Sequence, residues 1–462
     1  MGIYQLIKQL ASPPRVLNHW RVGTLLVILI FVKISYCQNT NLDKSDRPDS
    51  LLANNLYHQA DSLNEIGKFP VANEYYYAAR NIFEEMAADN HIYWQQFINC
   101  INKIGWNTAI YLGHPQDAIQ IIEENIEIVE NYIAPTDPVS IKFYNTYGVA
   151  LTISGYFEMA LHTLHLPLIN NHDSVKDSKG FISTYNSIGI VYNMKGNYDK
   201  ALTYFQHAHG IKIKLYGHDH PSLSATINNI GLVYWKKGDF GFAKDLFEQD
   251  IRLTEKYQGQ NHPDLAKSYT NLGIVVAEMG DLNSALLNFQ LALSIWENNK
   301  IDLHPSLAKN YMNQANILAD LNKFEKAKTL YDKALNIKLK IFDKSHPTIG
   351  ASYFEMGLWA LNQSYYQQAE DYLRNALAIY TKVKGEPNIA RALSALGKMY
   401  GIQKEYRKAL DYYEKGIRAN FKESIGIFPL QKSDLYSCSS QLVLLNSLQD
   451  KAMILFKLAL AG

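Results

Sequence analysis

The sequence predicts an all-α solenoid, a stack of helix–turn–helix repeats, and two periodic features of the chain support this. The dipeptide His-Pro begins at positions 220, 262, 304 and 346, so it returns every 42 residues. A small residue and an alanine keep the same interval. A fixed period of this length is typical of a stacked repeat array, in which each unit contacts its neighbours. The small residues are Gly189, Gly231, Gly273, Ala315 and Gly357, and the alanines are Ala201, Ala243, Ala285, Ala327 and Ala369.

A single repeat predicts two amphipathic helices joined by a turn. Residues 228–237 place apolar side chains at helical spacing, and Gly238 then ends the helix. A second apolar stripe follows within residues 240–251. His262-Pro263 opens the next helix, where proline is tolerated in the first turn because the N–H it lacks would have no intrahelical partner there.

Small residues mark the places where the two helices of a unit approach closely. Each is expected to face the alanine 12 positions later, with a large side chain four positions beyond that alanine. Such a unit cannot bury its apolar face alone, so neighbours must stack. Asp250 departs from the pattern, which predicts a polar contact or looser packing there. The large side chains are Phe205, Phe247, Phe289, Tyr331, Leu373 and Tyr413, and the residues matching Asp250 are Ala208, Ala292 and Ala334.

These offsets resemble the tetratricopeptide repeat, in the 42-residue variety found in kinesin light chains and in many bacterial proteins. The resemblance implies a right-handed α-solenoid whose first helices face a concave groove. Weaker copies of the pattern extend it in both directions, through Gly67, Gly113 and Gly155 before the central units and Gly397 after them. We therefore expect about nine repeats over residues 51–421.

The N-terminus has the composition of an export signal. A basic segment precedes a largely apolar run at residues 22–32, which is too short to span a bilayer. Ser35 and Cys37 are small residues suited to cleavage after Cys37, which makes residues 1–37 a signal peptide and 38–50 a linker. Lipidation of Cys37, an uncleaved anchor and a misplaced start codon are the alternatives. We expect export to the periplasm or the extracellular space, with membrane contact only through this segment if it is uncleaved or lipidated.

Composition and motifs exclude several classes of function. Lys and Arg number 45 against 44 Asp and Glu, so no net field attracts nucleic acid. The His-Pro histidines lie one repeat apart, whereas the ligands of one metal ion must all lie within about 2 Å of it. The sequence contains no glycine-rich phosphate loop, HExxH or GxSxG motif. Cys100 and Cys438 fall at opposite ends of the array, too far apart for a disulfide. We expect no catalytic residue, no metal and no cofactor.

The residues best placed for binding lie on the first helix of each unit. Asparagine recurs two or three positions before the small residue, and a cation stands six positions before it in several units. The resemblance implies that such asparagines hold a peptide backbone, since an amide both donates and accepts hydrogen bonds. The cations would favour an acidic ligand or a C-terminal carboxylate. The alternative is a solvated groove that merely tolerates asparagine. The candidate groove residues are Asn186, Asn228, Asn229, Trp235, Asn271, Asn313, Asn316, Lys267, Lys309 and Arg391.

The predicted function is a non-catalytic scaffold or sensor that binds a protein or peptide on its concave face. Residues 422–462 are expected to form a loop and a C-terminal capping or junction helix with an apolar end. Short stretches from Arg418 to Phe421 and from Ser433 to Ser437 resemble the junction in bacterial CHAT-domain proteins, which carry a caspase-like domain after such repeats. The alternative function is therefore the regulatory region of a split or truncated CHAT peptidase, or of a bacterial signalling protein.

Overall fold

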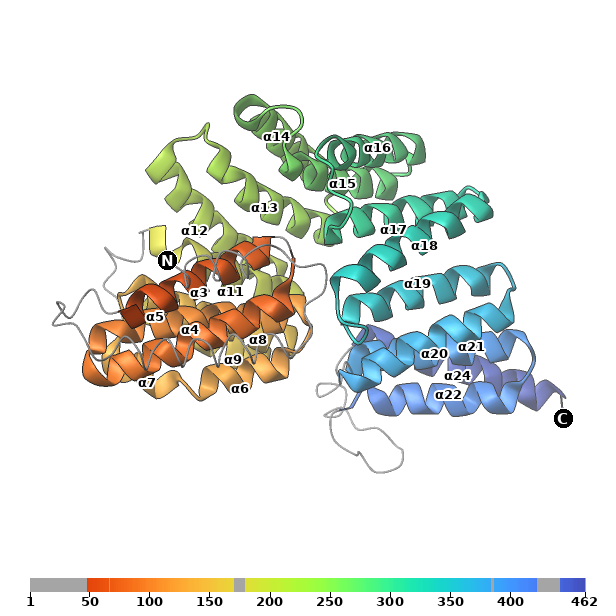
Figure 1. Cartoon of the computed structure of the whole chain (residues 1–462). Coiled ribbons are helices and arrows are strands. Elements are labelled where there is room, and N and C mark those ends of the chain that lie inside the picture. The colour runs from red at the N-terminus through yellow and green to blue at the C-terminus, as the bar shows by residue number, and fades with distance from the viewer. Residues whose placement is uncertain (1–47, 66, 170–178, 384–385, 422–440, 462) are drawn as a thin grey trace, which may run out of the picture. The chain divides into compact units, whose positions relative to one another are not determined.

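The computed structural model describes residues 48–65, 67–169, 179–383, 386–421 and 441–461. Within these ranges the chain is built from helices and contains no β-strand (Figure 1). The helices are α3 (Pro48–Glu65), α4 (Phe69–Asp89), α5 (Trp94–Trp106), α6 (Pro115–Glu123), α7 (Ile126–Tyr132), α8 (Pro138–Ile153), α9 (Phe157–Ile169), α11 (Ile182–Met194), α12 (Tyr198–Tyr216), α13 (Ser224–Lys237), α14 (Phe240–Gln258), α15 (Pro263–Glu278), α16 (Leu282–Asn298), α17 (Pro305–Asp320), α18 (Phe324–Ile341), α19 (Pro347–Asn362), α20 (Tyr366–Lys382), α21 (Glu386–Ile402), α22 (Tyr406–Ala419) and α24 (Gln441–Ala461). Short turns of 3₁₀ helix occur at η1 (His91–Tyr93), η3 (Lys179–Phe181) and η4 (Pro221–Leu223), and η2 (Asn107–Tyr111) is a π-helix.

The chain divides into two compact units, Met1–Asn55 and Leu56–Gly462. Within the described ranges the first unit contributes only the start of α3, and the other helices belong to the second. The predicted signal peptide at 1–37 lies outside the described residues, and so does the predicted linker except for its last residues. The predicted loop after residue 421 also falls outside them as far as residue 440.

Helices that follow one another in the sequence pack as pairs in the second unit. The most extensive contacts join α15 to α16, α17 to α18, α19 to α20 and α21 to α22. Adjacent pairs are joined in turn, for example through α14 with α15 and α20 with α21 (Figure 1). Each pair therefore contacts its neighbours, and the prediction of an all-α solenoid of stacked helix–turn–helix repeats is confirmed.

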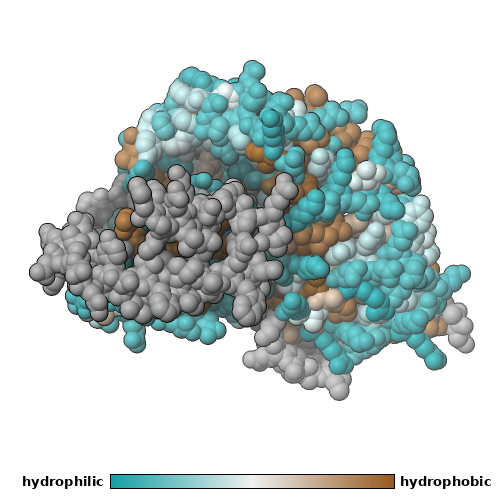
Figure 2. Space-filling model, viewed as in Figure 1, coloured by the Kyte–Doolittle hydropathy of each residue, from teal (hydrophilic) through white to brown (hydrophobic). Residues whose placement is uncertain are grey.

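A continuous apolar core follows from this stacking. One cluster of buried side chains extends from Ala243 and Phe247 on α14 to Ile454 on α24. The face of the molecule seen in Figure 2 is largely hydrophilic, with apolar residues in limited patches. The periodic alanines are all completely buried, because they lie where two helices touch: Ala201, Ala243, Ala285, Ala327 and Ala369.

Where the small residue of a unit is glycine, a β-carbon added there would meet the large side chain first, rather than the alanine. A β-carbon added at Gly273 would lie 2.6 Å from Cε1 of Phe289, closer than real side chains approach. At Gly231 the corresponding distance to Cε1 of Phe247 is 2.9 Å. The ring therefore packs directly on the bare backbone of the first helix, which fixes the separation of the two helices in the pair.

The His-Pro dipeptides begin helices. Nδ1 of His304 accepts a hydrogen bond from the backbone N–H of Ser306 at 3.1 Å, and proline takes the first helical position of α17. His262 does the same for α15. These rings occupy the N-cap position and satisfy an N–H that the helix itself leaves unpaired. The recurring histidine therefore has a local structural role in each repeat.

The C-terminal helix α24 packs on α21 and α22. Leu444 and Ile454 are buried on this side, and the hydroxyls of Ser447 and Ser394 are 2.6 Å apart. Other large apolar residues of α24 are exposed, among them Leu445, Met453, Leu455 and Phe456. None of the helices in the described ranges is both long and apolar enough to span a bilayer.

Candidate functional site

A polar cavity of about 460 Å³ lies among helices α13, α14, α15 and α17. The first helices of three consecutive units form its walls, and α14 adds Asp250 and Gln258. On α15 the lining residues Asp264, Lys267, Ser268 and Asn271 occupy positions i, i+3, i+4 and i+7 of the helix. Such spacing places side chains on a single face of a helix, so that face of α15 points into the cavity.

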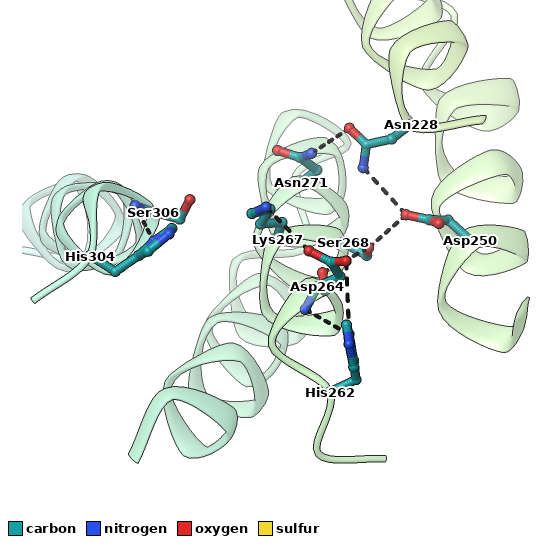
Figure 3. Close-up of polar contacts among 9 residues, drawn as sticks. All are labelled: Asn228, Asp250, His262, Asp264, Lys267, Ser268, Asn271, His304 and Ser306. Carbon is teal, nitrogen blue, oxygen red and sulfur yellow. Dashed lines mark hydrogen bonds and ion pairs between the residues drawn. The ribbon is translucent and has the colours of Figure 1, made fainter. Parts of the chain in front are cut away.

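Asp250 is the most buried charged residue of this cavity, with only 1% of its surface exposed. Its Oδ2 accepts hydrogen bonds from the hydroxyl of Ser268 at 2.6 Å and from Nδ2 of Asn228 at 3.3 Å (Figure 3). Burial raises the pKa of the carboxyl above its ordinary value, and hydrogen bonding by Ser224, Ser268 and Asn228 offsets part of that rise. The polar contact expected at this departure from the repeat is therefore present, and it joins α14 to both α13 and α15.

Two amides carry the hydrogen bonding from Asp250 across the cavity. Nδ2 of Asn271 donates to Oδ1 of Asn228 at 3.1 Å (Figure 3). Oδ1 of Asn271 in turn accepts from Nζ of Lys309 at 3.5 Å, the longest contact of the series. A carboxylate only accepts, so Asn228 must turn its NH₂ group toward Asp250 and its carbonyl oxygen toward Asn271. The orientation of each amide follows from this chain of donors and acceptors, which runs through helices α14, α13, α15 and α17.

The two lysines of the cavity differ in their surroundings. Lys267 is paired with Asp264 on the same helix, with 3.2 Å between Nζ and Oδ1. Lys309 has no carboxylate partner within the described part of the chain. The cavity walls desolvate its ammonium group and Lys236 repels it, and both effects lower the pKa of Lys309 below its ordinary value.

The sequence of this region also identifies its repeats. A sequence model of the tetratricopeptide repeat matches residues 181–256, 306–382 and 356–420. The chain carries tetratricopeptide repeats. The first matched segment covers α13 and almost all of α14, and the second begins on α17 at Ser306, so matched segments supply three of the four helices around the cavity.

Comparison with solved structures finds several chains that resemble this one. A Rap protein in complex with competence and sporulation factor is 13% identical, with a TM-score of 0.50 over 80% of this chain and 98% of that one. Aspartyl phosphate phosphatase F from Bacillus subtilis is 13% identical, with a TM-score of 0.46 over 85% of this chain and 99% of that one. BtubC (BKLC) from P. vanneervenii is 17% identical, with a TM-score of 0.44 over 50% and 92%. No curated protein sequence matches the chain. At 13% identity, the likeness to the Rap protein concerns the fold alone.

The cavity brings together five of the groove residues predicted from the tetratricopeptide pattern. Asn228, Asn229, Lys267, Asn271 and Lys309 all line it, although they come from three different repeats. Since the repeats stack in register, residues at matching positions of consecutive first helices become neighbours.

The other five predicted groove residues lie outside this cavity. Asn186 and Asn313 each keep one buried side-chain atom, Oδ1 and Nδ2 respectively, without a hydrogen-bond partner in the described structure. Oδ1 of Asn316 accepts a hydrogen bond from the hydroxyl of Tyr331. Nζ of Lys236 lies 4.5 Å from the ring centre of Trp235, and the guanidinium of Arg391 lies 4.7 Å from that of Phe354.

Several residues of the cavity were not predicted as site residues. The sequence marks Asp250 only as a departure from the repeat, and that departure is the signal that points to it. Ser268, Asp264 and Ser306 carry no comparable signal, because serine and aspartate are common on exposed helix faces. Their role becomes visible only when α13, α15 and α17 are placed side by side.

Neither a metal-binding cluster nor an activated thiol is found among the described residues. They contain no group of three His, Cys, Asp or Glu side chains that could hold a metal ion. Cys100 is fully buried, and burial raises the pKa of its thiol to about 12, so the reactive thiolate is strongly disfavoured. Cys438 lies outside the described residues.

Proposed function

We propose that this tetratricopeptide array is a non-catalytic scaffold or sensor that binds a protein or an extended peptide across its first helices. One observation carries the proposal: five groove residues predicted from their repeat positions converge on a single polar cavity. Amides in such a cavity can pair with the backbone of an extended chain whatever its side chains are. Lys267 and Lys309 add a preference for an acidic segment or a C-terminal carboxylate.

A triple variant tests the groove. Replacing Asn229, Asn271 and Asn313 by Ala removes amides from three first helices. Purified wild-type and variant chains are compared on an array of peptides with acidic or neutral sequences and free or amidated C-termini. We expect the variant to bind the wild-type-selected peptides at least tenfold more weakly, with a thermal unfolding midpoint within a few degrees of wild type.

A matched control separates binding from general surface effects. Asn283, Asn362 and Asn375 are exposed asparagines outside the cavity, and their triple replacement by Ala should leave binding unchanged. Equal binding by the groove variant and this control would contradict the proposed function. A wild-type chain that selects no peptide at all would contradict the peptide form of the proposal.

A second candidate is a regulatory region that acts on another domain, as in CHAT-domain or signalling proteins. It is favoured by the exposed apolar side of α24, with Leu445, Met453, Leu455 and Phe456, since apolar patches of this kind mark interaction sites. Reading the gene beyond codon 462 tests it. A continuing frame that encodes a His–Cys pair would support the peptidase form, and a domain of another kind would favour the signalling form. A stop codon with no further frame, together with a wild-type chain that recruits no second chain in a pull-down, would contradict both.

We further propose that the chain is exported, with residues 1–37 removed. Edman sequencing of the protein recovered from cell fractions provides the test. An N-terminus at Gln38 in the periplasmic or extracellular fraction would support export and cleavage. An intact N-terminus in the cytoplasmic fraction would contradict both.

A further inference from the structure

His346 differs from the other histidines of the His-Pro series in its surroundings. His220, His262 and His304 are partly exposed, whereas His346 is only 6% exposed. All four rings accept a backbone N–H at the start of a helical segment through Nδ1, so capping does not explain the difference. The additional cover of His346 comes from a distant part of the chain, the turn between η2 and α6.

The ring of His346 contacts this turn directly. Its Nε2 lies 3.2 Å from the carbonyl oxygen of Ile110, which is 236 residues away in the sequence. A hydrogen bond between neighbouring repeats, such as that from Asn271 to Asn228, spans only 43 residues. The two segments in contact both belong to the second compact unit. The contact of His346 therefore joins the pair α5–α6 to the pair α19–α20, although several repeats separate them in the sequence.

Gly113 provides the space for this contact. A β-carbon added at Gly113 would lie 2.6 Å from Cδ2 of His346 and 3.0 Å from Cδ of Pro347. Gly155 occupies the corresponding turn of the next unit, and there an added β-carbon would have no neighbour within 4 Å. Both glycines have a left-handed backbone, with φ of 73° at Gly113 and 79° at Gly155. The two turns therefore have similar local geometry, but only the first of them packs against the start of α19.

The hydrogen bonds of His346 require a neutral ring. Nδ1 accepts the backbone N–H of Thr348 at 3.2 Å, so this nitrogen carries no proton. The proton of the neutral ring is then on Nε2, which donates to the carbonyl oxygen of Ile110. A second proton, on Nδ1, would break the bond from the N–H of Thr348 and leave only the Thr348 hydroxyl, 2.8 Å away, to accept it. It would also place a charge in a buried site, on a ring that stacks on Phe342.

The groups around His346 also favour the neutral ring. Burial has the largest effect and lowers the pKa of His346 below its ordinary value. Repulsion from His114 on the turn and from Lys338 on α18 acts in the same direction, whereas the hydrogen bond to Ile110 and attraction to Asp343 oppose it. Because the pKa is lowered where the contact is formed, the contact is fully present above about pH 6.5, the ordinary pKa of histidine, and is lost as the pH falls below it.

We propose that the contact between His346 and the turn at Ile110–Gly113 is a pH-sensitive latch, which holds the pairs α5–α6 and α19–α20 together while the ring is neutral and releases them when the ring is protonated. After release, these two pairs are connected only through the repeats that lie between them in the sequence, so the distance between them increases. The latch is a property of the array itself and does not depend on the proposed ligand.

The test measures the distance between the two segments in the full chain by electron paramagnetic resonance. Spin labels are attached at Gln116→Cys, beside the turn on α6, and at Lys344→Cys, before α19, because both positions are exposed. Cys37 and Cys438 are replaced by serine. Cys100 stays in place, since its thiol is fully buried and burial raises its pKa to about 12. Far-UV circular dichroism at each pH reports whether the helices remain folded.

Lowering the pH from 7.5 to 5.5 is expected to reduce the fraction of labelled molecules with the short distance by about threefold or more. His346→Asn keeps an acceptor at the helix cap but is too short to reach Ile110, so it should show the long distance at both pH values. His304→Asn is the matched control, because His304 caps α17 and stacks on Trp296 of the adjacent helix. This control should respond to pH as the labelled parent chain does.

A second pair of variants tests the contact at pH 7.5, without any titration. Gly113→Ala places a methyl group against the His346 ring and should give the long distance. Gly155→Ala carries the same strain of a left-handed backbone without the contact, so it should keep the short distance. This pair decides the matter if the chain loses its helices at pH 5.5.

Three outcomes would overturn the inference. The first is a folded parent chain whose distance is the same at both pH values. The second is a His346→Asn chain that keeps the pH response, which would assign that response to other groups. The third is a Gly113→Ala chain with the same short distance as Gly155→Ala, which would show that the contact does not hold the two pairs together.

Discussion

Gly273→Ala tests whether the bare backbone of the first helix sets the spacing of a helix pair. The added methyl group would lie 2.6 Å from Cε1, 2.9 Å from Cδ1 and 3.0 Å from Cζ of Phe289. Phe289 is 1% exposed and belongs to the continuous core, so its ring has little room to retreat. Overpacking of this kind costs about 1–3 kcal/mol.

A gain in helix propensity opposes this cost. Alanine is favoured over glycine inside a helix by about 1 kcal/mol. In the unit built on α17 the corresponding positions are held by Ala315 and Tyr331, both buried, so the repeat can accommodate a methyl group at this position. The α15–α16 pair is spaced for glycine at this position, so the two helices or the Phe289 ring must move to admit the methyl group of Gly273→Ala. We expect a net destabilisation of about 1 kcal/mol.

Gly210→Ala is the matched control for this prediction. Gly210 lies inside α12, and a β-carbon there would have no neighbour within 4 Å. Only the propensity gain remains, so this variant should be more stable than wild type by about 0.5–1 kcal/mol. Urea denaturation followed by far-UV circular dichroism measures both variants, with stability compared from the midpoints where the slopes agree. Gly273→Ala at or above the stability of Gly210→Ala would refute the reasoning.

Two further predictions concern a helix cap and the C-terminal helix. Burial, reinforced by repulsion from Lys267, lowers the pKa of His304, so the folded state favours its neutral ring and the free energy of unfolding should fall as the pH drops below about 6.5. His304→Asn keeps a side-chain acceptor at the helix cap but removes the titrating ring. In urea denaturation, its free energy of unfolding should therefore change less between pH 7.5 and 5.5 than that of wild type, and an equal change would contradict this prediction. Ile454→Ala should remove about 2–4 kcal/mol of packing from α24 and speed its cleavage in limited proteolysis. Phe456→Ala is the control, because that side chain is 61% exposed, and equal cleavage of the two variants would count against the docked helix.

Much of the fold could be predicted because it depends on local and periodic features. Apolar residues at helical spacing, a turn glycine such as Gly238 and the His-Pro cap each act within one repeat. Gly238 has the expected left-handed backbone, with φ of 81°, at the end of α13. The expectation that each small residue faces an alanine was less accurate, since Gly273 packs first against Phe289. The spacing of the small residues correctly identified the face of the first helix that packs on the second helix. It did not identify the side chain in contact, because the ring of Phe289 is long enough to reach Gly273.

The candidate site could be predicted only in part. Asn228 and Asn271 stand nearly one period apart, so the repeat itself predicts that they are neighbours. Asp250 could be recognised in the sequence as a departure from the repeat pattern. Its partners on α13 and α15 could not, because these contacts depend on how α14 packs between the two first helices. Arg391 matched Lys267 and Lys309 in position, yet the structure places it over Phe354 and outside the cavity.

The sequence by itself therefore determined the period, the helix–turn–helix unit and the face of the first helix that carries the polar residues. These properties follow from hydrophobic periodicity and from caps, which act over a few residues. Only the tertiary structure decided which polar residues share one cavity and which of their atoms remain free. The direction of a hydrogen bond depends on the group at its far end, and for Asn228 and Asn271 that group is a carboxylate buried on another helix.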